Sequence, residues 1–167
     1  MSVIFERCSI RKYKDTPVPD VLIHEILKAG MAAPSAGGKK PWHFVVIKSK
    51  EVLQRIADEH PYGKMLSKCP VAIAVCADKT LSNFDVDFWP LDCSAATENI
   101  LLHAVEKGLG AVWVSIYPRE ERIKLLKNLL GLPDNVIPVA LVPMGYPAEK
   151  KVQSDCFDSS RIHLEKW

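Results

Sequence analysis

The range 90–117 constrains the fold of this chain more than any other part of the sequence. Its first part, 92–107, has few charged residues, so apolar or small side chains would face almost every direction around a helix. Asp92 can accept hydrogen bonds from the free N–H groups at the start of that helix. Gly108 can adopt the left-handed conformation that ends it. We therefore expect a central helix that is buried on all sides.

The residues within and after this helix indicate what surrounds it. Small residues at 94–97 would allow another backbone to approach closely. After a glycine-containing turn at 108–110 comes the range 111–114, whose β-branched and aromatic residues favour a strand. A buried helix that leads directly into a strand is a scaffold, so the functional residues have to be sought elsewhere in the chain.

Hydrophobic periodicity and turn residues predict the other elements. The expected helices cover 2–7, 20–32, 50–57 and 119–130, and the expected strands cover 43–48, 70–77 and 137–144. Ser49 would cap the helix that follows it. The almost purely apolar strand at 70–77 is typical of the middle of a sheet. Pro118 suits the first turn of the helix after it, and Gly131 suits the end of that helix.

Length and composition limit the function. The 167 residues, nearly half of them apolar, suit a single domain over 1–167, and the net charge is only +2. No apolar run is long enough to span a membrane, and the first residues do not have the pattern of a secretory signal. The five cysteines include no Cys-x-x-Cys pair, and the histidines lack metal-ligand spacing. We expect free thiols, a cytoplasmic location, no metal, and neither nucleic acid nor membrane as partner.

Three polar residues near the start form the first candidate site. Arg7, Ser9 and Arg11 alternate, and alternate side chains point the same way in an extended segment. Two guanidinium groups and a hydroxyl suit a phosphate, which accepts forked N–H donation. The alternative, which spacing alone favours, is a solvated basic turn. Cys8 lies between these charges and is either a reactive thiol or, as we expect, a packed side chain.

The loop at 34–42 is the second candidate. Its glycines would let the backbone approach a ligand closely, Ser35 offers a hydroxyl, and Lys39 and Lys40 offer charge. The sequence contains neither a P-loop nor a Gly-x-Gly-x-x-Gly dinucleotide motif. Taken alone, this loop is equally well a mobile surface loop.

Two other regions allow more than one interpretation. The aromatic and apolar residues between 62 and 89 suggest a lid or, as we expect, an ordinary packed loop. The range 147–167 is polar with scattered apolar residues and has no core of its own. Such a C-terminal arm is either disordered or lies on a surface, a partner's surface included.

In chain order, these pieces resemble the FMN-dependent nitroreductase family. The similar motifs are Arg7-Cys-Ser-Ile-Arg-Lys-Tyr13, Ala33-Pro-Ser-Ala-Gly-Gly-Lys-Lys-Pro-Trp-His-Phe44, the central helix with Gly108-Leu-Gly-Ala-Val-Trp113, Leu130-Gly-Leu-Pro133 and Met144-Gly-Tyr-Pro147. The tail at 157–167 is also similar to that of short family members. No single motif is decisive, whereas five in order are specific.

The resemblance implies an α+β, nitroreductase-like fold, in which helices flank a mainly antiparallel central sheet, and a homodimer with two FMN sites at its interface. It also implies ping-pong chemistry, in which NADPH or NADH reduces FMN and the flavin reduces a nitroaromatic, a quinone or a similar small electrophile. No side chain is expected to act as a catalytic acid or base. The alternatives are oxygen-dependent flavin fragmentation or reductive dehalogenation on the same scaffold, and a flavin-binding protein without turnover.

The resemblance also assigns roles to residues. Arg7 and Ser9 would hold the phosphate, and Arg11 would lie nearer the ribityl chain or the pyrimidine ring. The loop at 34–38 would pack on the flavin from the other chain, and the backbone at Ser115 and Ile116 would face flavin N5 and O4. The predicted cofactor-binding residues are Arg7, Cys8, Ser9, Arg11, Pro34, Ser35, Ala36, Gly37, Gly38, Lys40, Ser115, Ile116, Lys151 and Arg161.

The sequence departs from the family pattern at three positions. Gly38 stands where the family often has Asn, and Lys40 stands where it often has Gln. Cys156 takes the place of a basic tail residue that is common near the phosphate. Lys151 or Arg161 would then supply that contact.

Three features together predict a two-fold dimer with exchanged tails. The central helix has small residues on a surface free of charge. The arm at 147–167 has apolar anchors without a core to bury them. The loop at 34–42 resembles one that, in the family, reaches the flavin bound mainly by the other subunit.

Overall fold

The computed structural model describes residues 2–153 and 155–167 of the chain. Its helices are α1 Val3–Glu6, α2 Asp20–Met31, α3 Lys50–Glu59, α4 Trp89–Glu106 and α5 Glu120–Leu130. Its strands are β1 Trp42–Ile47, β2 Val71–Asp78, β3 Gly110–Ala111, β4 Val114–Ser115 and β5 Val136–Gly145. Short 3-10 helices are η1 Ala36–Gly38, η2 Lys64–Lys68, η3 Lys79–Leu81 and η4 Ser159–Arg161. Within these residues, no helix combines the length and apolarity that crossing a bilayer requires.

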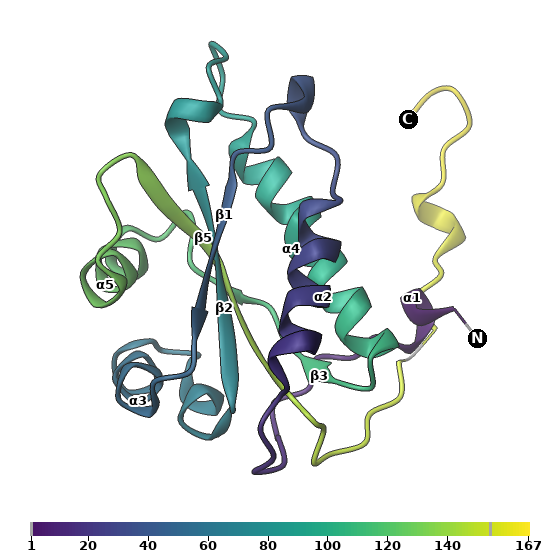
Figure 1. Cartoon of the computed structure of the whole chain (residues 1–167). Coiled ribbons are helices and arrows are strands. Elements are labelled where there is room, and N and C mark those ends of the chain that lie inside the picture. The colour runs from purple at the N-terminus through teal and green to yellow at the C-terminus, as the bar shows by residue number, and fades with distance from the viewer. Residues whose placement is uncertain (1, 154) are drawn as a thin grey trace.

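One antiparallel sheet forms the middle of the molecule, in the order β1–β2–β5–β3, with β4 also paired to β5. Helices α2 and α4 cover one face, and α3 and α5 cover the other (Figure 1). The central strand β2 is buried throughout 71–77, as its apolar sequence predicts. Ile73 and Val75 pack beneath α2 and α4, whereas Ala72 and Ala74 pack beneath α3 and α5. The predicted α+β class and antiparallel sheet are confirmed.

Helix α4 begins earlier than the sequence predicts. It starts at Trp89, with Pro90 in its first turn, so Asp92 is not the N-cap. Proline suits a first turn because the N–H it lacks would be unpaired there. Asp92 is buried instead, and one of its oxygens accepts a hydrogen bond from the Ala36 N–H at 2.8 Å. The end of the helix is as predicted, because Gly108 has a φ of +72°.

The prediction that α4 is buried on all sides is wrong for this chain alone. Cys93, Ala96 and Ile100 are fully buried in the core layer between α4 and the sheet. Leu91 keeps 67% of its surface exposed. The outer face of α4 therefore leaves apolar surface that a partner could cover.

The strand predicted at 111–114 is divided into β3 and β4, although both pair with β5 in one register. The division falls opposite Pro143, which has no N–H to donate to the ladder. A second correction concerns Pro118, which precedes the N-cap residue Arg119 and so lies outside the first turn of α5. Gly131 ends α5 with a φ of +62°, as predicted.

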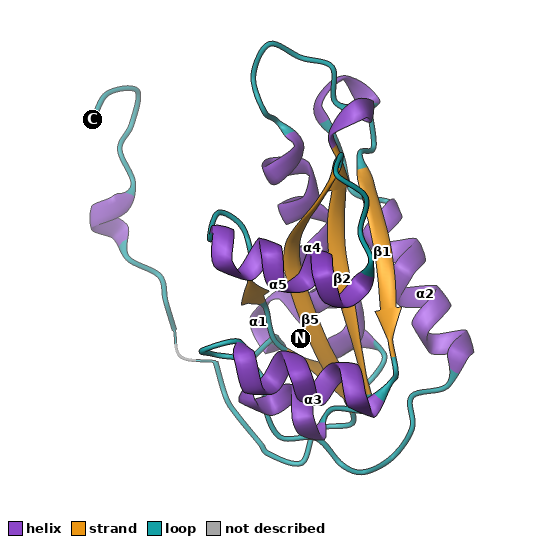
Figure 2. Ribbon diagram, turned by 90° about the vertical axis from the view of Figure 1, so that its left-hand side faces the viewer, coloured by secondary structure: helices purple, strands orange, loops and turns teal. Residues whose placement is uncertain are grey.

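Residues 155–167 of the C-terminal arm stand away from the body of the molecule in both views (Figures 1 and 2), whereas 147–151 contact the segment after α1. The arm contains the short helix η4, and its apolar side chains Phe157 and Leu164 are 75% and 87% exposed. This placement agrees with the expectation that the arm lacks a core of its own.

Candidate functional site

A cavity of about 600 Å³ lies beside β4, within the size range of small-molecule sites. Four parts of the chain supply its walls: the segment after α1, the turn between α3 and η2, the range from β3 to β4, and α5. The lining residues are Arg11, His60, Pro61, Tyr62, Lys64, Met65, Val112, Trp113, Val114, Ser115 and Arg122.

The charged side chains that line this cavity are all positive. Arg11, Lys64 and Arg122 are cations at neutral pH, and none of the lining residues is Asp or Glu. The range 112–114 adds an apolar floor of Val, Trp and Val. The combination suits a flat apolar ligand whose edge is rich in hydrogen-bond acceptors or carries negative charge.

His60 is a buried polar group at the cavity wall, only 2% exposed. Its Nδ1 accepts a hydrogen bond from the Tyr62 N–H at 3.2 Å, so the proton of the neutral ring lies on Nε2. That Nε2 is buried, and hydrogen bonding with the Ser115 backbone raises the pKa of the ring. Burial, and then the nearby charge of Arg122, outweigh this contact and hold the pKa of His60 below its ordinary value. Burial therefore favours the neutral ring.

Arg122 is fixed by two contacts. Its Nη1 donates to the carbonyl of Ser115 at 2.9 Å, and its guanidinium lies 5.5 Å from the centre of the Tyr62 ring. Its Nε is buried and has no hydrogen-bond partner in the described part of the chain.

The segment after α1 brings some of the sequence-predicted residues together. Ser9 forms a parallel bridge with Ala111, and its carbonyl accepts from Lys151 Nζ at 2.9 Å and from Arg11 Nη1 at 3.4 Å. Glu149 accepts from the Arg11 N–H at 2.6 Å, and this bond is the largest cause that lowers the pKa of Glu149. Arg11, Ser9 and Lys151 thus form one polar group.

Arg7 and Cys8 do not join the polar group of Ser9, Arg11 and Lys151. Arg7 turns towards α4, where its Nε lies 3.5 Å from Glu98 Oε1. Cys8 is a half-buried free thiol in contact with the core layer on the α3 side of the sheet. The phosphate role of Arg7 and the cofactor contact of Cys8 remain predictions.

The loop containing Pro34, Ser35, Ala36, Gly37, Gly38 and Lys40 lies at the other end of the molecule. Gly37 has a φ of +54°, and a Cβ there would lie 2.9 Å from Phe84 Cζ. The Lys40 N–H donates to Ser35 Oγ at 2.9 Å, which closes the turn.

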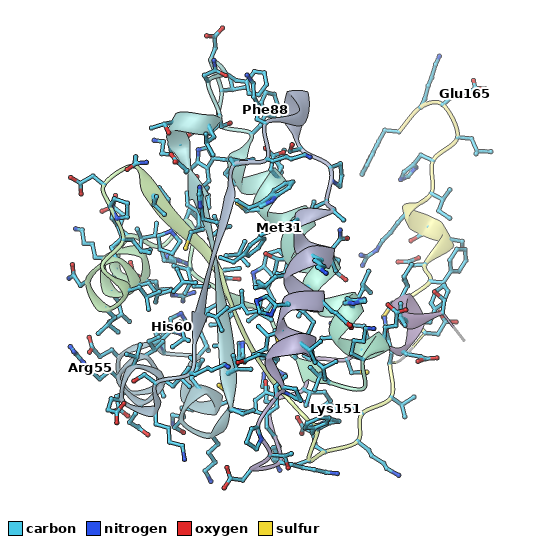
Figure 3. The ribbon with its side chains drawn as sticks, viewed as in Figure 1. Met31, Arg55, His60, Phe88, Lys151 and Glu165 are labelled. Carbon is cyan, nitrogen blue, oxygen red and sulfur yellow. The ribbon has the colours of Figure 1, made fainter. Side chains whose placement is uncertain are left out.

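Helix α4 separates the loop from the segment that contains Ser9. The loop is bound to the first turn of α4 through Asp92, whereas Ser9 bridges Ala111 just after the last turn. Because Asp92 lies 14 residues before the end of α4 at Glu106, these points lie about 21 Å apart along its axis. Phe88, which precedes α4, and Lys151 accordingly lie at opposite ends of the view (Figure 3).

Of the remaining predicted residues, one lines the cavity and two do not. Ser115 lines the cavity. Ile116 is fully buried, and its N–H donates to the Val139 carbonyl at 3.1 Å. Arg161 is exposed in the arm and pairs with Asp158 at 3.0 Å. The contacts expected of Ile116 and Arg161 with the cofactor remain predictions.

Sequence reasoning missed His60, Lys64 and Arg122 as site residues. In this region the sequence marks only the aromatic and apolar residues from Tyr62 on, which predict an ordinary packed loop. Arg122 reaches the cavity because α5 folds back beside β4, which no local motif encodes.

The residues present fit FMN. The flavin ring has carbonyl oxygens and ring nitrogens that accept hydrogen bonds, and the cavity is lined by the donor side chains of Arg11, Lys64 and Arg122. The phosphate needs cations: Arg11 lines the cavity, and Lys151 contacts the Ser9 carbonyl next to it, where it also lies 3.4 Å from Glu149. Among the described residues, no group of three or more His, Cys, Asp or Glu side chains could hold a metal ion.

Comparison with known proteins agrees with this geometry. A protein from Methanothermobacter thermautotrophicus, provisionally named NADH dehydrogenase/NAD(P)H nitroreductase, is 49% identical over the whole of this chain and 87% of its own length. A crystal structure of a similarly named protein from Parabacteroides distasonis has a TM-score of 0.95, with 40% identity over 99% of this chain and 96% of that one.

A provisionally named nitroreductase from Desulfovibrio desulfuricans, crystallised in complex with FMN, has a TM-score of 0.84 and 29% identity over 99% of this chain and 95% of that one. The sequence model described as the Nitroreductase family matches residues 4–60 and 59–146. By this match and by the identity with its relatives, the chain belongs to the nitroreductase family.

Proposed function

We propose that this protein is an FMN-dependent NAD(P)H oxidoreductase that reduces nitroaromatics, quinones or a similar small electrophile. Its relatives carry the names NADH dehydrogenase/NAD(P)H nitroreductase, and one solved neighbour binds FMN. The observation that carries the proposal is the cavity of about 600 Å³, lined by the cations Arg11, Lys64 and Arg122 and by the apolar range 112–114. Bound FMN would accept electrons from NADPH or NADH and pass them to the electrophile in two separate half-reactions.

The residues of the chain would bind and orient the cofactor. Ser9, Arg11 and Lys151, together with Arg7 after it leaves Glu98, would hold the phosphate. The cavity floor at 112–114 would support the ring, and the polar wall would face its edge. No side chain is assigned a proton-transfer role, because the flavin supplies the redox chemistry.

We also propose that each site is completed by a second copy of the chain. The loop at 34–40 and Ser9 lie about 21 Å apart along the axis of α4 within one chain, so the loop would reach the flavin only from a partner. The exposed arm and the apolar outer face of α4 support the same arrangement, a homodimer with exchanged arms. The free thiols of Cys8, Cys69, Cys76 and Cys93 favour action in the reducing cytoplasm.

The cofactor is tested directly. The purified protein should be yellow, and mass spectrometry after denaturation should find FMN and no FAD. Under anaerobic conditions NADH or NADPH should bleach the colour, and an added quinone should restore it. A colourless protein that does not bind added FMN would overturn the proposal. Bound FMN that neither nicotinamide reduces would favour a passive flavin-binding protein.

The exchanged arm is tested by truncation. A chain ending at Lys151 loses Phe157, Leu164 and Trp167, side chains at least 75% exposed that would be buried only against a partner. Sedimentation equilibrium should show a dimer for the full chain and a raised dissociation constant for the shorter one. Equal dimer stability for both chains would contradict the exchange.

A further inference from the structure

Arg122 is one of three cations that line the cavity, with Arg11 and Lys64, and no ion pair is found for these three among the described residues. Lys107 pairs with Glu25 at 2.7 Å, and Arg55 pairs with Glu59 at 3.9 Å. Among the described residues, no carboxylate forms an ion pair with Arg122, whose Nε is buried. Burying part of a charge without an opposite charge is unfavourable, so an anionic group in the cavity would relieve the cost.

The position of this charge is fixed as well as unbalanced. The carbonyl of Ser115 and the face of the Tyr62 ring hold the guanidinium from two sides. Tyr62 is in turn connected to His60, because its N–H donates to His60 Nδ1. A charge held in place in advance needs little rearrangement when negative charge develops beside it.

We propose that Arg122 sets the charge preference of the cavity and favours the reduced form of a bound flavin over the oxidised form. This inference rests on the proposed function. Arg122 is a positioning and electrostatic residue here, since it acts through its charge and through the Ser115 peptide.

The charge balance of the reaction supports this role. Reduced nicotinamide gives up two electrons and one proton and leaves as the oxidised nicotinamide. The flavin ring that receives them gains one negative charge unless it also takes a second proton from solvent. A guanidinium keeps its own proton at neutral pH, so Arg122 would stabilise that charge without transferring a proton. The side chain of Arg11 and that of Lys64 lie on the same cavity and would act in the same direction.

The test compares Arg122→Gln and Arg122→Lys with Arg119→Gln, a change of an exposed arginine at the N-cap of the same helix. Spectroelectrochemical titration gives the midpoint potential of bound FMN, and fluorescence titration gives the affinity for oxidised FMN. Arg122→Gln should lower the ratio of the affinities for reduced and oxidised FMN roughly tenfold, about 30 mV for a two-electron couple. Arg122→Lys should restore most of the potential, and Arg119→Gln should leave it unchanged.

The outcomes separate the two levels of the proposal. Arg122→Gln with stoichiometric FMN and an unchanged potential would overturn the role of Arg122 and leave the oxidoreductase in place. An equal drop in Arg122→Lys and Arg122→Gln would also overturn it, because a specific packing contact and not charge would then matter. Wild-type protein without flavin would instead overturn the proposed function. If Arg122→Gln is unstable, Arg122→Met keeps the aliphatic stem and serves as the neutral variant.

Discussion

His60 connects the stability of this protein to pH near neutrality. Its ring is 2% exposed, and burial lowers its pKa, so the folded state resists protonation. The unfolded chain takes up that proton at pH values below about 6.5. The free energy of unfolding should therefore rise with pH through this window and fall as the solution becomes more acidic.

We expect His60→Gln to remove this contribution. Between pH 5 and 7, the slope of the unfolding free energy against pH should decrease by up to about 1.4 kcal/mol per pH unit, the value for one proton. Urea denaturation at fixed FMN concentration measures it. His24→Gln, on the exposed face of α2, is the matched control. If the plots of unfolding free energy against pH are parallel for wild type and His60→Gln, the pKa of His60 is the same in the folded and the unfolded chain.

At the level of single residues, the alternation of Ser9 and Arg11 is visible in the sequence, but spacing alone favours a solvated basic turn there. Their grouping with Lys151 depends on a contact across 142 positions of the chain. The contact between Arg122 and the Ser115 carbonyl depends on how α5 returns towards β4. Arg7 alternates with Ser9 but turns to Glu98, because a neighbouring helix offers a carboxylate that the spacing cannot reveal.

Among the elements, the contact between the loop at 34–40 and α4 is the most informative. Asp92 Oδ1 accepts the Ala36 N–H at 2.8 Å, and the Asp92 side chain is almost fully buried. The first turn of a helix also favours a negative charge. This contact holds the loop at the end of α4, where the proposal requires it to face a partner.

Asp92→Ala should cost about 1.5 to 3 kcal/mol of unfolding free energy, the range for a hydrogen bond to a charged group. It should also weaken FMN binding, because the loop would lose its anchor. Asp92→Asn keeps an acceptor and should cost less in both measurements. Asp87→Ala, in the exposed loop before α4, is the control. Urea denaturation and FMN titration are the measurements. If Asp92→Ala has the stability and the FMN affinity of the wild type, this hydrogen bond does not anchor the loop.

Periodicity predicts most elements because their signals are local. Ser49 caps α3 by accepting from the Val52 N–H, and β2 is the central strand that its apolar run indicates. The errors have tertiary causes. Asp92 has the right side chain for an N-cap, but it bonds the loop instead. The strand at 111–114 is divided by a proline on its partner strand, 29 residues or more further along the chain.

For the whole molecule, the proposal of a site shared between chains has a quantitative test. Arg7→Ala should weaken the phosphate site, and Ser35→Trp should disrupt the loop, whose turn Ser35 Oγ closes. If each change abolishes FMN binding, refolding an equal mixture of the two chains should give half heterodimers. Each heterodimer would contain one site with both defects and one with neither. About a quarter of all sites should then bind FMN.

Absorbance at 450 nm per chain would measure the regained flavin in that mixture. Each variant refolded alone, at the same total concentration, is the control and should remain colourless. If heterodimers form and no flavin is regained, both segments serve the same site from one chain.

The pairing of Ser9 with Ala111 also bears on how the protein is made. The segment at 9–14 forms its backbone contacts with Ala111, Tyr146 and Ala148, more than a hundred residues further along the chain. A ribosome that has just released this segment has not yet translated its partners. The segment must therefore wait until the last sheet strand emerges before it can dock. Flavin would then load after synthesis of the body, so limiting riboflavin should yield folded apoprotein and not truncated or degraded chains.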